Sequence, residues 1–185
     1  MIRHETSDLS GLDVCELSAS GPLVEFFARS ARRAEFSEYS GESERGSCFS
    51  GVRNEDVQRL TYADESFDLV THSEVMEHVP DDHAAFRELR RVLRKTGCMI
   101  FTVPLSAGAT VERVRLDSQG QVEHLLEPAY HTDPWRKGEG ILAFRDYGED
   151  IVERLNAAGF SDVDIRQPTL LIDWLPLRFV IVARP

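Results

Sequence analysis

Residues 66–103 carry the clearest structural pattern of the chain, beginning with the run Ser66-Phe67-Asp68-Leu69-Val70-Thr71-His72. The β-branched and aromatic residues of this run are typical of a strand. An apolar stripe at helical spacing follows, and its members are Ala85, Phe86, Leu89, Val92 and Leu93. The run from Cys98 to Val103 is almost continuously apolar, which indicates a strand buried on both faces. Strand, helix and buried strand within about 40 residues predict a βαβ unit.

The ends of the predicted helix are marked by residues that favour helix termini. Asp81 or Asp82 can cap its first turn, and Pro80 precedes both. We expect Gly97 to end the helix, since glycine is the common residue just past a helix C-terminus.

Further strands and helices are expected on both sides of this unit. Towards the N-terminus, the patterns predict strands at 12–17, 34–39 and 52–57, and a helix that starts at Gly21-Pro22. Towards the C-terminus, they predict a helix that starts around Asp146 and Glu149 and ends at Gly159, then strands at 163–165 and 179–183. This alternation predicts an α/β three-layer sandwich with a mostly parallel sheet and an antiparallel strand at the C-terminal end.

Composition narrows the class of protein. The chain has 185 residues, which suits a single domain spanning 1–185. Its net charge of −11 disfavours binding to nucleic acid or to an anionic membrane, because both need clustered Lys and Arg. No apolar run approaches the ~20 residues of a membrane span, and residues 1–13 lack the apolar core of a secretory signal. The three cysteines are far apart, so we expect a cytoplasmic protein with free thiols.

Polar residues follow several of the predicted strands. In a mostly parallel sheet, ligands bind outside the carboxyl ends of the strands, near the point where the strand order reverses. The residues at these ends are Glu16, Ser18, Ser20, Gly21, Glu38, Tyr39, Asp56, His72, Ser73, Glu74, Pro104 and Leu105.

Two stretches resemble a known family. One is the run from Asn54 to Val70, which contains Asp64-Glu65-Ser66-Phe67-Asp68. The other is Glu77-His78-Val79-Pro80, followed by Arg87 to Gly97 with the sequence RELRRVLRKTG. Together they resemble the class I S-adenosylmethionine-dependent methyltransferases of the small-molecule type, with their Rossmann-like fold. The resemblance covers about Leu12 to Val103.

The resemblance implies S-adenosylmethionine as the cofactor. The residues that it assigns to the cofactor are Glu16, Ser18, Gly21, Glu38, Asp56, His72 and Ser73. Glu38 suits the ribose, because a carboxylate can accept hydrogen bonds from two hydroxyl groups. Asp56 suits the adenine amino group, and His72 and Ser73 lie where the methionine and the sulfonium would pass. Each of these residues also has an alternative interpretation. Glu38 would be a solvated acid, Asp56 a turn residue, and Glu16 a residue that orients the loop.

The loop after the first strand departs from the family pattern. The family usually has G-x-G-x-G, whereas this chain has Glu16-Leu17-Ser18-Ala19-Ser20-Gly21 with a single glycine. Two functional hypotheses follow. The first is an enzyme that transfers a methyl group to an O or N atom of a small molecule. The second is a non-catalytic binding or scaffold module that keeps the fold but has a degenerate cofactor loop.

Residues 106–145 form a long insertion after the last strand of the βαβ unit. Its few periodic runs and its length suggest a functional lid over the acceptor. The run Glu127-Pro128-Ala129-Tyr130-His131-Thr132-Asp133-Pro134 resembles a P-x-Y-H-x-x-P segment of one subgroup of the family, which hints at a sugar or glycan acceptor. We expect His131 to act as the catalytic base, with Tyr130 beside it and Trp135 nearby, because a neutral imidazole can accept a proton near pH 7. A loop histidine bonded to backbone is the alternative.

No metal site is expected from the sequence. The run Glu74-Val75-Met76-Glu77-His78 differs by one residue from the inverted zinc-protease motif H-x-x-E-H, because Glu74 stands where histidine is required. His72 and His78 also fit ordinary surface or helix-capping roles. A small-molecule acceptor is the expected partner. The stretch before the first strand is short. We therefore expect either an open cofactor site or a homo-oligomer in which another subunit supplies the lid.

Overall fold

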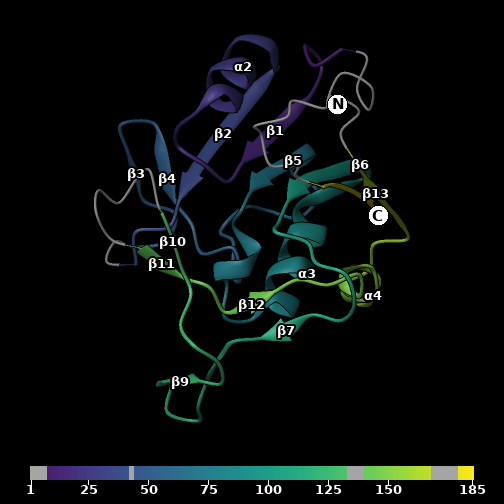
Figure 1. Cartoon of the computed structure of the whole chain (residues 1–185). Coiled ribbons are helices and arrows are strands. Elements are labelled where there is room, and N and C mark those ends of the chain that lie inside the picture. Colours follow the sequence, from purple (N-terminus) through teal and green to yellow (C-terminus); the bar gives the residue numbers. More distant parts are fainter. Residues whose placement is uncertain (1–7, 42–43, 133–139, 168–178) are drawn as a thin grey trace.

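The described part of the chain, residues 8–41, 44–132, 140–167 and 179–185 of a computed structural model, is organised around an eight-stranded sheet (Figure 1). The sheet has the strand order β13-β14-β6-β5-β1-β2-β4-β3. Its strands are β1 (Asp13–Glu16), β2 (Arg33–Glu38), β3 (Cys48–Phe49), β4 (Val52–Asn54), β5 (Phe67–Ser73), β6 (Leu93–Thr102), β13 (Asp162–Arg166) and β14 (Val180–Arg184). Trp135, Pro134 and Trp174 lie outside the described residues.

The central strands of the sheet are parallel, as predicted. β4, β2, β1, β5 and β6 pair in parallel, whereas β14 runs antiparallel to both β6 and β13. β1 pairs with β2 on one side and with β5 on the other, so the strand order reverses at β1. A ligand site is therefore expected just beyond Glu16, at the carboxyl end of β1.

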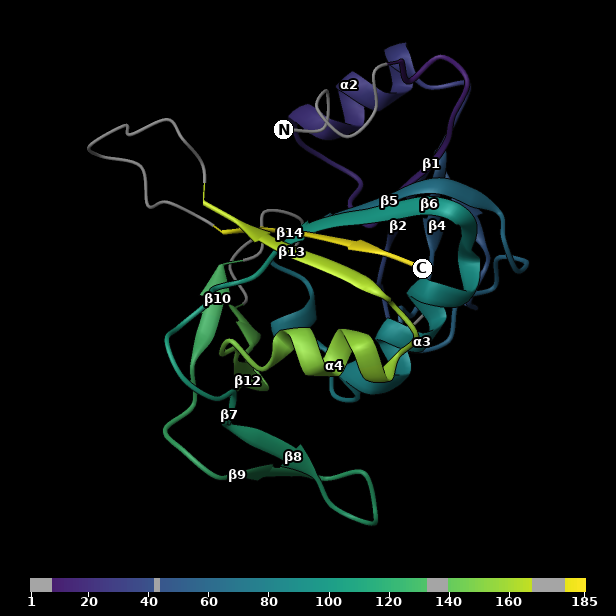
Figure 2. The ribbon, with the colours of Figure 1, turned by 90° about the vertical axis from the view of Figure 1, so that its right-hand side faces the viewer.

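Helices cover both faces of the sheet and make the predicted three layers (Figure 2). In the described residues they are α2 (Pro22–Ser30), α3 (Asp82–Val92) and α4 (Ile151–Ala157), and the 3-10 turn η1 (Met76–His78) precedes α3. α2 lies on one face and packs Phe27 against Val14 and Leu69 of the sheet. α3 and α4 lie on the opposite face, where Phe86, Leu89 and Leu155 join the larger apolar core. Within the described residues, no helix is long and apolar enough to cross a membrane.

The βαβ unit begins its helix as predicted but ends it earlier. Asp81 is the N-cap of α3, and its Oδ1 accepts a hydrogen bond from the Ala84 N–H at 2.9 Å. The expectation that Gly97 caps the helix is wrong, because α3 ends at Val92 and Gly97 lies within β6. A Cβ at position 97 would lie 2.8 Å from the Asp68 carbonyl oxygen. Glycine is therefore needed here for a close approach of β6 to the neighbouring strand.

Two other boundaries also differ from the predictions. The helix expected from Asp146 begins only after Asp150, since Asp146 lies in a short strand and its carboxylate pairs with Arg113. The strand expected over 52–57 stops at Asn54, because Asp56 turns the chain by accepting the Gln58 N–H. The end of the last helix at Gly159 is confirmed, and this glycine has a φ of 99°.

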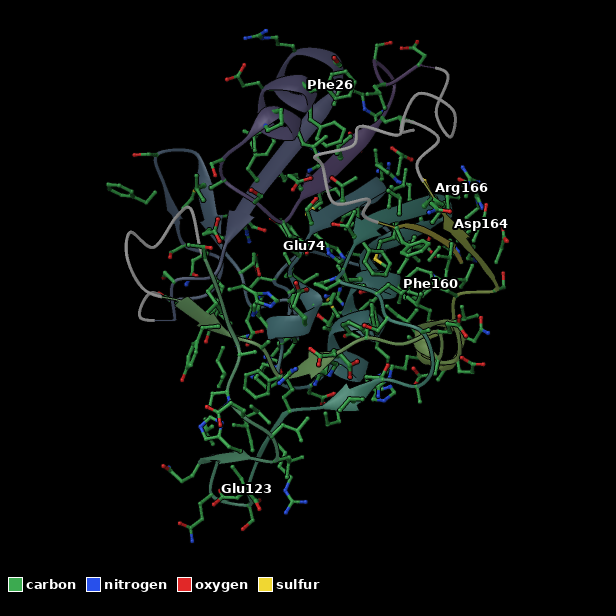
Figure 3. The ribbon with its side chains drawn as sticks, in the orientation of Figure 1. Phe26, Glu74, Glu123, Phe160, Asp164 and Arg166 are labelled. Atoms are coloured by element: carbon green, nitrogen blue, oxygen red, sulfur yellow. The ribbon has the colours of Figure 1, made fainter. Side chains whose placement is uncertain are left out.

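The long insertion consists of short antiparallel strands. They are β7 (Val111–Glu112), β8 (Val114–Leu116), β9 (Val122–His124), β10 (Tyr130–Thr132), β11 (Gly140–Leu142) and β12 (Arg145–Asp146). The β8–β9 hairpin projects away from the sheet and carries Glu123 at its outer end (Figure 3). The β10–β11 pair lies beside the sheet edge that carries the ends of β1, β2 and β4 (Figure 1). The insertion thus places Tyr130 and His131 at the edge where a ligand site is expected.

Candidate active site

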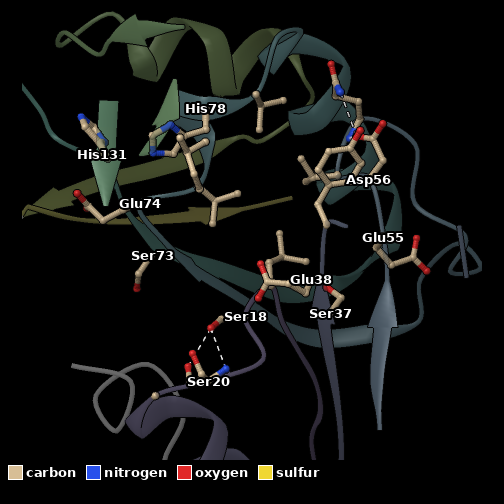
Figure 4. A pocket seen from close by; sticks show the side chains of 18 of the residues that line it. Ser18, Ser20, Ser37, Glu38, Glu55, Asp56, Ser73, Glu74, His78 and His131 are labelled. Atoms are coloured by element: carbon tan, nitrogen blue, oxygen red, sulfur yellow. Dashed lines mark hydrogen bonds between the residues drawn. The ribbon is translucent and has the colours of Figure 1, made fainter. Parts of the chain in front are cut away.

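A cleft of about 1030 Å³ opens at the carboxyl ends of the parallel strands. Its walls come from the ends of β1, β2, β4, β5 and β6, from η1, and from the β10–β11 pair. Figure 4 shows Ser18 and Ser20 at one end, Asp56 at a second, and His78 and His131 at a third. Its volume lies at the upper end of the ~300–1,000 Å³ range of small-molecule sites.

The loop after β1 turns without the glycines that the family pattern usually supplies. The Ser18 hydroxyl donates to the Ser20 carbonyl oxygen at 2.9 Å and accepts the Ser20 N–H at 3.3 Å. Within this loop, only Gly21 has a positive φ, of 101°, and it is the N-cap residue of α2. Because neither serine adopts the left-handed conformation, their Cβ atoms impose no strain on the loop.

Glu38 and Asp56 both line the cleft, at the end of β2 and just beyond β4. The Glu38 Oε2 accepts the Ala19 N–H at 3.3 Å, which ties the carboxylate to the loop after β1. The Asp56 Oδ1 accepts both the backbone N–H and the side-chain amide of Gln58, at 2.9 and 3.0 Å. Asp56 is therefore a turn residue that also faces the cleft, and the two interpretations of this residue are compatible.

The structure places two of the predicted cofactor residues below the cleft. Glu16 is only 2% exposed and accepts a hydrogen bond from the Thr71 hydroxyl, and burial raises its pKa to about 7. His72 is 1% exposed and its ring stacks on Phe101 with centroids 4.6 Å apart. Burial lowers the pKa of His72 to about 3, so this ring is neutral. Neither side chain lines the cleft, and the expected contact of His72 with a ligand is corrected.

The end of β5 contributes Ser73, as predicted, and also Glu74. Glu74 has a φ of 54°, an uncommon conformation for a residue with a Cβ. Its N–H donates to the Thr102 carbonyl oxygen at 3.0 Å, and its Oε1 accepts the Thr102 hydroxyl at 2.8 Å. These two bonds to β6 hold the strained residue and aim the chain towards η1. The sequence pattern places Glu74 just after the predicted strand but predicts no role for it in the site.

η1 brings Glu77 and His78 to the end of the cleft next to the insertion. The carbonyl of Glu77 accepts the Phe144 N–H at 2.7 Å, and the Nδ1 of His78 lies 2.9 Å from the Leu142 carbonyl oxygen. Arg145, which is buried, donates to the carbonyl oxygens of Met76, Val79 and Pro80. The end of the insertion therefore fixes the turn that carries Glu77 and His78.

His131 completes this end of the cleft from β10. Its ring lies edge-on to that of His78, with centroids 4.8 Å apart, and its Nδ1 is 3.6 Å from the Glu77 Oε1. Glu77 is 1% exposed, whereas the His131 side chain is 40% exposed. Tyr130 also lines the cleft and is 61% exposed at its rim. The sequence predicted roles in the site for Tyr130 and His131 but assigned none to their neighbours Glu77 and His78, which it quoted only as parts of motifs.

The sequence matches the model of a protein family described as a methyltransferase domain, over residues 7–101. This match covers more than half of the chain. The chain belongs to this family. It is a class I S-adenosylmethionine-dependent methyltransferase, and S-adenosylmethionine is its methyl donor. No curated protein matches it significantly in sequence.

Solved methyltransferase structures share the fold of this methyltransferase. An S-adenosylmethionine dependent methyltransferase from Mesorhizobium loti is 20% identical, with a TM-score of 0.63, covering 100% of this chain and 95% of that one. The 1,6-didemethyltoxoflavin-N1-methyltransferase of Burkholderia thailandensis is 16% identical, with a TM-score of 0.58, covering 99% and 77% of the two chains.

The residues of the methyltransferase fit its donor. The cleft starts where the strand order reverses, and an unstrained small-residue loop borders it there. Two carboxylates, Glu38 and Asp56, lie along the same wall (Figure 4). A hydroxyl-rich and amine-bearing ligand needs such acceptors, because carboxylate oxygens accept several hydrogen bonds each.

Proposed function

We propose that this methyltransferase transfers a methyl group to an O or N atom of a small polar molecule bound at the His78–His131 end of its cleft. The observation that carries the proposal is the two-part cleft. One part lies against the loop after β1, Glu38 and Asp56, and the other lies against η1 and β10. The second part is lined by aromatic and imidazole side chains, which suit a compact polar acceptor.

In this proposal, the donor lies across the ends of β1, β2 and β4. Glu38 would accept hydrogen bonds from the two ribose hydroxyls, and Asp56 would accept one from the adenine amino group. The loop Ser18–Gly21 and Ser73 would border the methionine part. Glu16 would act from below by supporting the loop through β1, and His72 would have no contact with the donor.

His131 would activate the acceptor. When bound, S-adenosylmethionine supplies a methyl group made electrophilic by its sulfonium. The acceptor's lone pair forms the new bond to the methyl carbon, while the electron pair of the breaking C–S bond stays on sulfur. An acceptor O–H or N–H must also lose its proton, which His131 would accept. Placing the two reactants in one enclosed cleft would supply much of the rate.

The acceptor class is a small molecule, with a sugar or glycan precursor as the narrower proposal. The net charge of −11 opposes the approach of a polyanion such as nucleic acid. Exposed Tyr130 offers an aromatic face at the rim, on which a sugar or a flat ring can pack. The similar Burkholderia thailandensis protein is an N-methyltransferase whose structure holds a small acceptor and S-adenosylhomocysteine, which supports this class. Residues 106–145 would serve as the lid over the acceptor.

The experiment combines donor binding with an acceptor screen. Calorimetric titration with S-adenosylmethionine and S-adenosylhomocysteine should show saturable binding to one site per chain. A panel of sugars, nucleotide sugars and aromatic amines is then screened for release of S-adenosylhomocysteine. Binding without release by any acceptor class would support the scaffold hypothesis. Release with an oligonucleotide or a protein alone would overturn the small-molecule proposal.

A further inference from the structure

We propose that Glu77, His78 and His131 bind one divalent transition-metal ion at the acceptor end of the cleft. The inference rests on the proposed function only in placing the acceptor there, and it specifies how His131 would activate that acceptor. It revises the expectation of no metal site, which considered the run from Glu74 to His78 alone. The histidine that this run lacks is supplied from β10, more than 50 residues later in the chain.

The potential ligand atoms are already gathered around one point. One atom from each residue lies within 4.8 Å of the other two. The Glu77 Oε1 lies 3.6 Å from the His131 Nδ1 and 3.8 Å from the His78 Nε2. A four-coordinate ion with bonds of about 2.1 Å separates its ligand atoms by about 3.4 Å. The two glutamate–histidine pairs are within a few tenths of an ångström of this spacing, and the two imidazoles would approach each other by up to about 1.4 Å when an ion binds.

The hydrogen bond that His78 makes through Nδ1 fixes the ring in the tautomer whose Nε2 can bind a metal. The Leu142 carbonyl oxygen can only accept, so the His78 Nδ1, at 2.9 Å, carries the proton. In the neutral ring, Nε2 then presents a lone pair towards the Glu77 carboxylate. Two lone-pair-bearing atoms facing each other call for a cation between them. Metal-ligating histidines commonly donate their other N–H to a carbonyl in this way.

The burial of the Glu77 and His78 side chains and the rigid turn that carries them favour binding of an ion. The Glu77 side chain is 1% exposed and that of His78 is 11% exposed, whereas that of His131 is 40% exposed and borders the cleft. A carboxylate shielded from water interacts strongly with a cation beside it, because the surroundings screen the charge weakly. The turn that carries Glu77 and His78 is fixed by Arg145 through three carbonyl oxygens. The site is thus rigid on the protein side and open on the cleft side.

The ligand set selects the class of metal. Two imidazole nitrogens and one carboxylate oxygen suit Zn²⁺, Fe²⁺, Co²⁺ or Mn²⁺, whereas Mg²⁺ and Ca²⁺ prefer oxygen ligands alone. Three protein ligands also leave coordination positions for another molecule, as in catalytic zinc sites. These positions would take a hydroxyl or amine of the acceptor.

A metal at this site would change the role of His131 from base to ligand. An ion lowers the pKa of a bound hydroxyl, so the proton can leave to solvent rather than to the imidazole. The oxygen lone pair then forms the bond to the methyl carbon, and the C–S electron pair remains on sulfur. No oxidant or reductant is needed, because the ion keeps its charge throughout.

The first test measures binding of the metal alone. The untagged chain is stripped with a chelator, dialysed and titrated with Co²⁺, Zn²⁺ or Mg²⁺, and bound metal is quantified by elemental mass spectrometry. We expect one Co²⁺ or Zn²⁺ per chain with visible absorption from Co²⁺, and no stoichiometric binding of Mg²⁺. Absence of a bound transition metal in the wild-type chain would overturn the proposal.

The second test assigns the ligands. His131→Ala and His78→Ala should each weaken Co²⁺ binding by about 100-fold and change its absorption, and Glu77→Gln should weaken it similarly. His124→Ala is the matched control, since His124 is exposed on β9 and lies outside the cleft. Because Glu77 is buried and its variant can lose stability, the half-exposed His131 provides the decisive comparison. Equal binding by His131→Ala and His124→Ala would place the ion elsewhere and overturn the proposal.

The third test separates this inference from the proposed function. Methyl transfer to the acceptor found by screening is compared in chelated and Co²⁺- or Zn²⁺-loaded protein. Turnover that depends on the ion supports its activating role. Equal turnover in both forms would overturn that role and leave His131 as the base, with the proposed function intact. Metal binding in a protein that methylates no acceptor would instead contradict the proposed function, while the site itself stands.

Discussion

The two ends of the cleft are built in different ways. The proposed donor end uses residues at or just after the ends of β1, β2 and β4, so the parallel sheet alone brings them together. The proposed acceptor end joins η1 to an insertion that follows much later in the chain, through contacts such as that of His78 with Leu142, 64 residues away. The first arrangement follows from topology, whereas the second depends on specific tertiary contacts. Variants at the two ends should therefore affect different measurements.

The largest effect is expected for His131→Ala. This change should lower turnover by about 10²–10⁴, the range for loss of a group that activates the acceptor, and leave donor affinity within about twofold. Steady-state kinetics and calorimetric titration measure the two quantities. His124→Ala should change neither. A collapse of donor binding with normal turnover would show that the two ends are not separate.

Arg145→Met should damage the acceptor end through stability. Arg145 is buried, donates to three carbonyl oxygens near Glu77 and pairs with Glu112. Removing one partner of such a network costs about 3–5 kcal/mol, which urea unfolding would detect. Arg115→Met, which removes an exposed pair with Glu123, should leave the urea unfolding midpoint nearly unchanged, because solvent screens exposed ion pairs. A loss below about 1 kcal/mol for Arg145→Met would mean that the turn holds its shape without the insertion.

Glu16 should make the donor end sensitive to pH. Burial raises its pKa from 4.5 to about 7, so the folded chain binds this proton more tightly than the unfolded chain. The stability that this group contributes is present below pH 4.5 and is lost as the pH rises through 7. Relative to Glu16→Gln, the wild type should lose roughly 2–3 kcal/mol of unfolding free energy between pH 5 and pH 8. Parallel pH profiles of the two proteins would contradict this, and Glu25→Gln on exposed α2 is the control.

The smallest effect is expected for Glu38→Ala. Loss of two charge-assisted ribose bonds should weaken donor binding at least tenfold, or about 1.4 kcal/mol. Unfolding free energy should change little, because Glu38 lies at a strand end. Glu35→Ala on the same strand is the control, since Glu35 does not line the cleft. Equal dissociation constants for the two variants would remove Glu38 from the donor site.

The cleft residues at the strand ends could be predicted from the sequence more directly than the neighbours of His131, for physical reasons. The ends of strands can be predicted from the sequence, because β-branched runs stop at polar residues. Residues predicted at such ends line the cleft, namely Ser18, Glu38, Asp56 and Ser73. His72 was misplaced because neighbouring residues of a strand point to opposite faces, and a one-residue step separates the cleft from the core.

The helix and turn boundaries that were wrong depended on long-range packing. Gly97 is required by the approach of β6 to the Asp68 carbonyl, and no local pattern records that contact. The close approach of Glu77 to His131 could not be predicted from the sequence for the same reason. Each residue lies in a motif that the sequence shows, but no pattern in the sequence places β10 beside η1.

The insertion is attached to η1 mainly through backbone carbonyl groups, which affects how sequences of this family can change during evolution. Phe144 and Arg145 bind carbonyl oxygens of residues 76, 77, 79 and 80, and His78 binds the carbonyl oxygen of Leu142. Every amino acid presents the same carbonyl group, so most side chains along these two segments can be replaced while the attachment persists. Exchanging the β10–β11 region between homologues is therefore a natural route to new acceptor preferences on an unchanged donor platform.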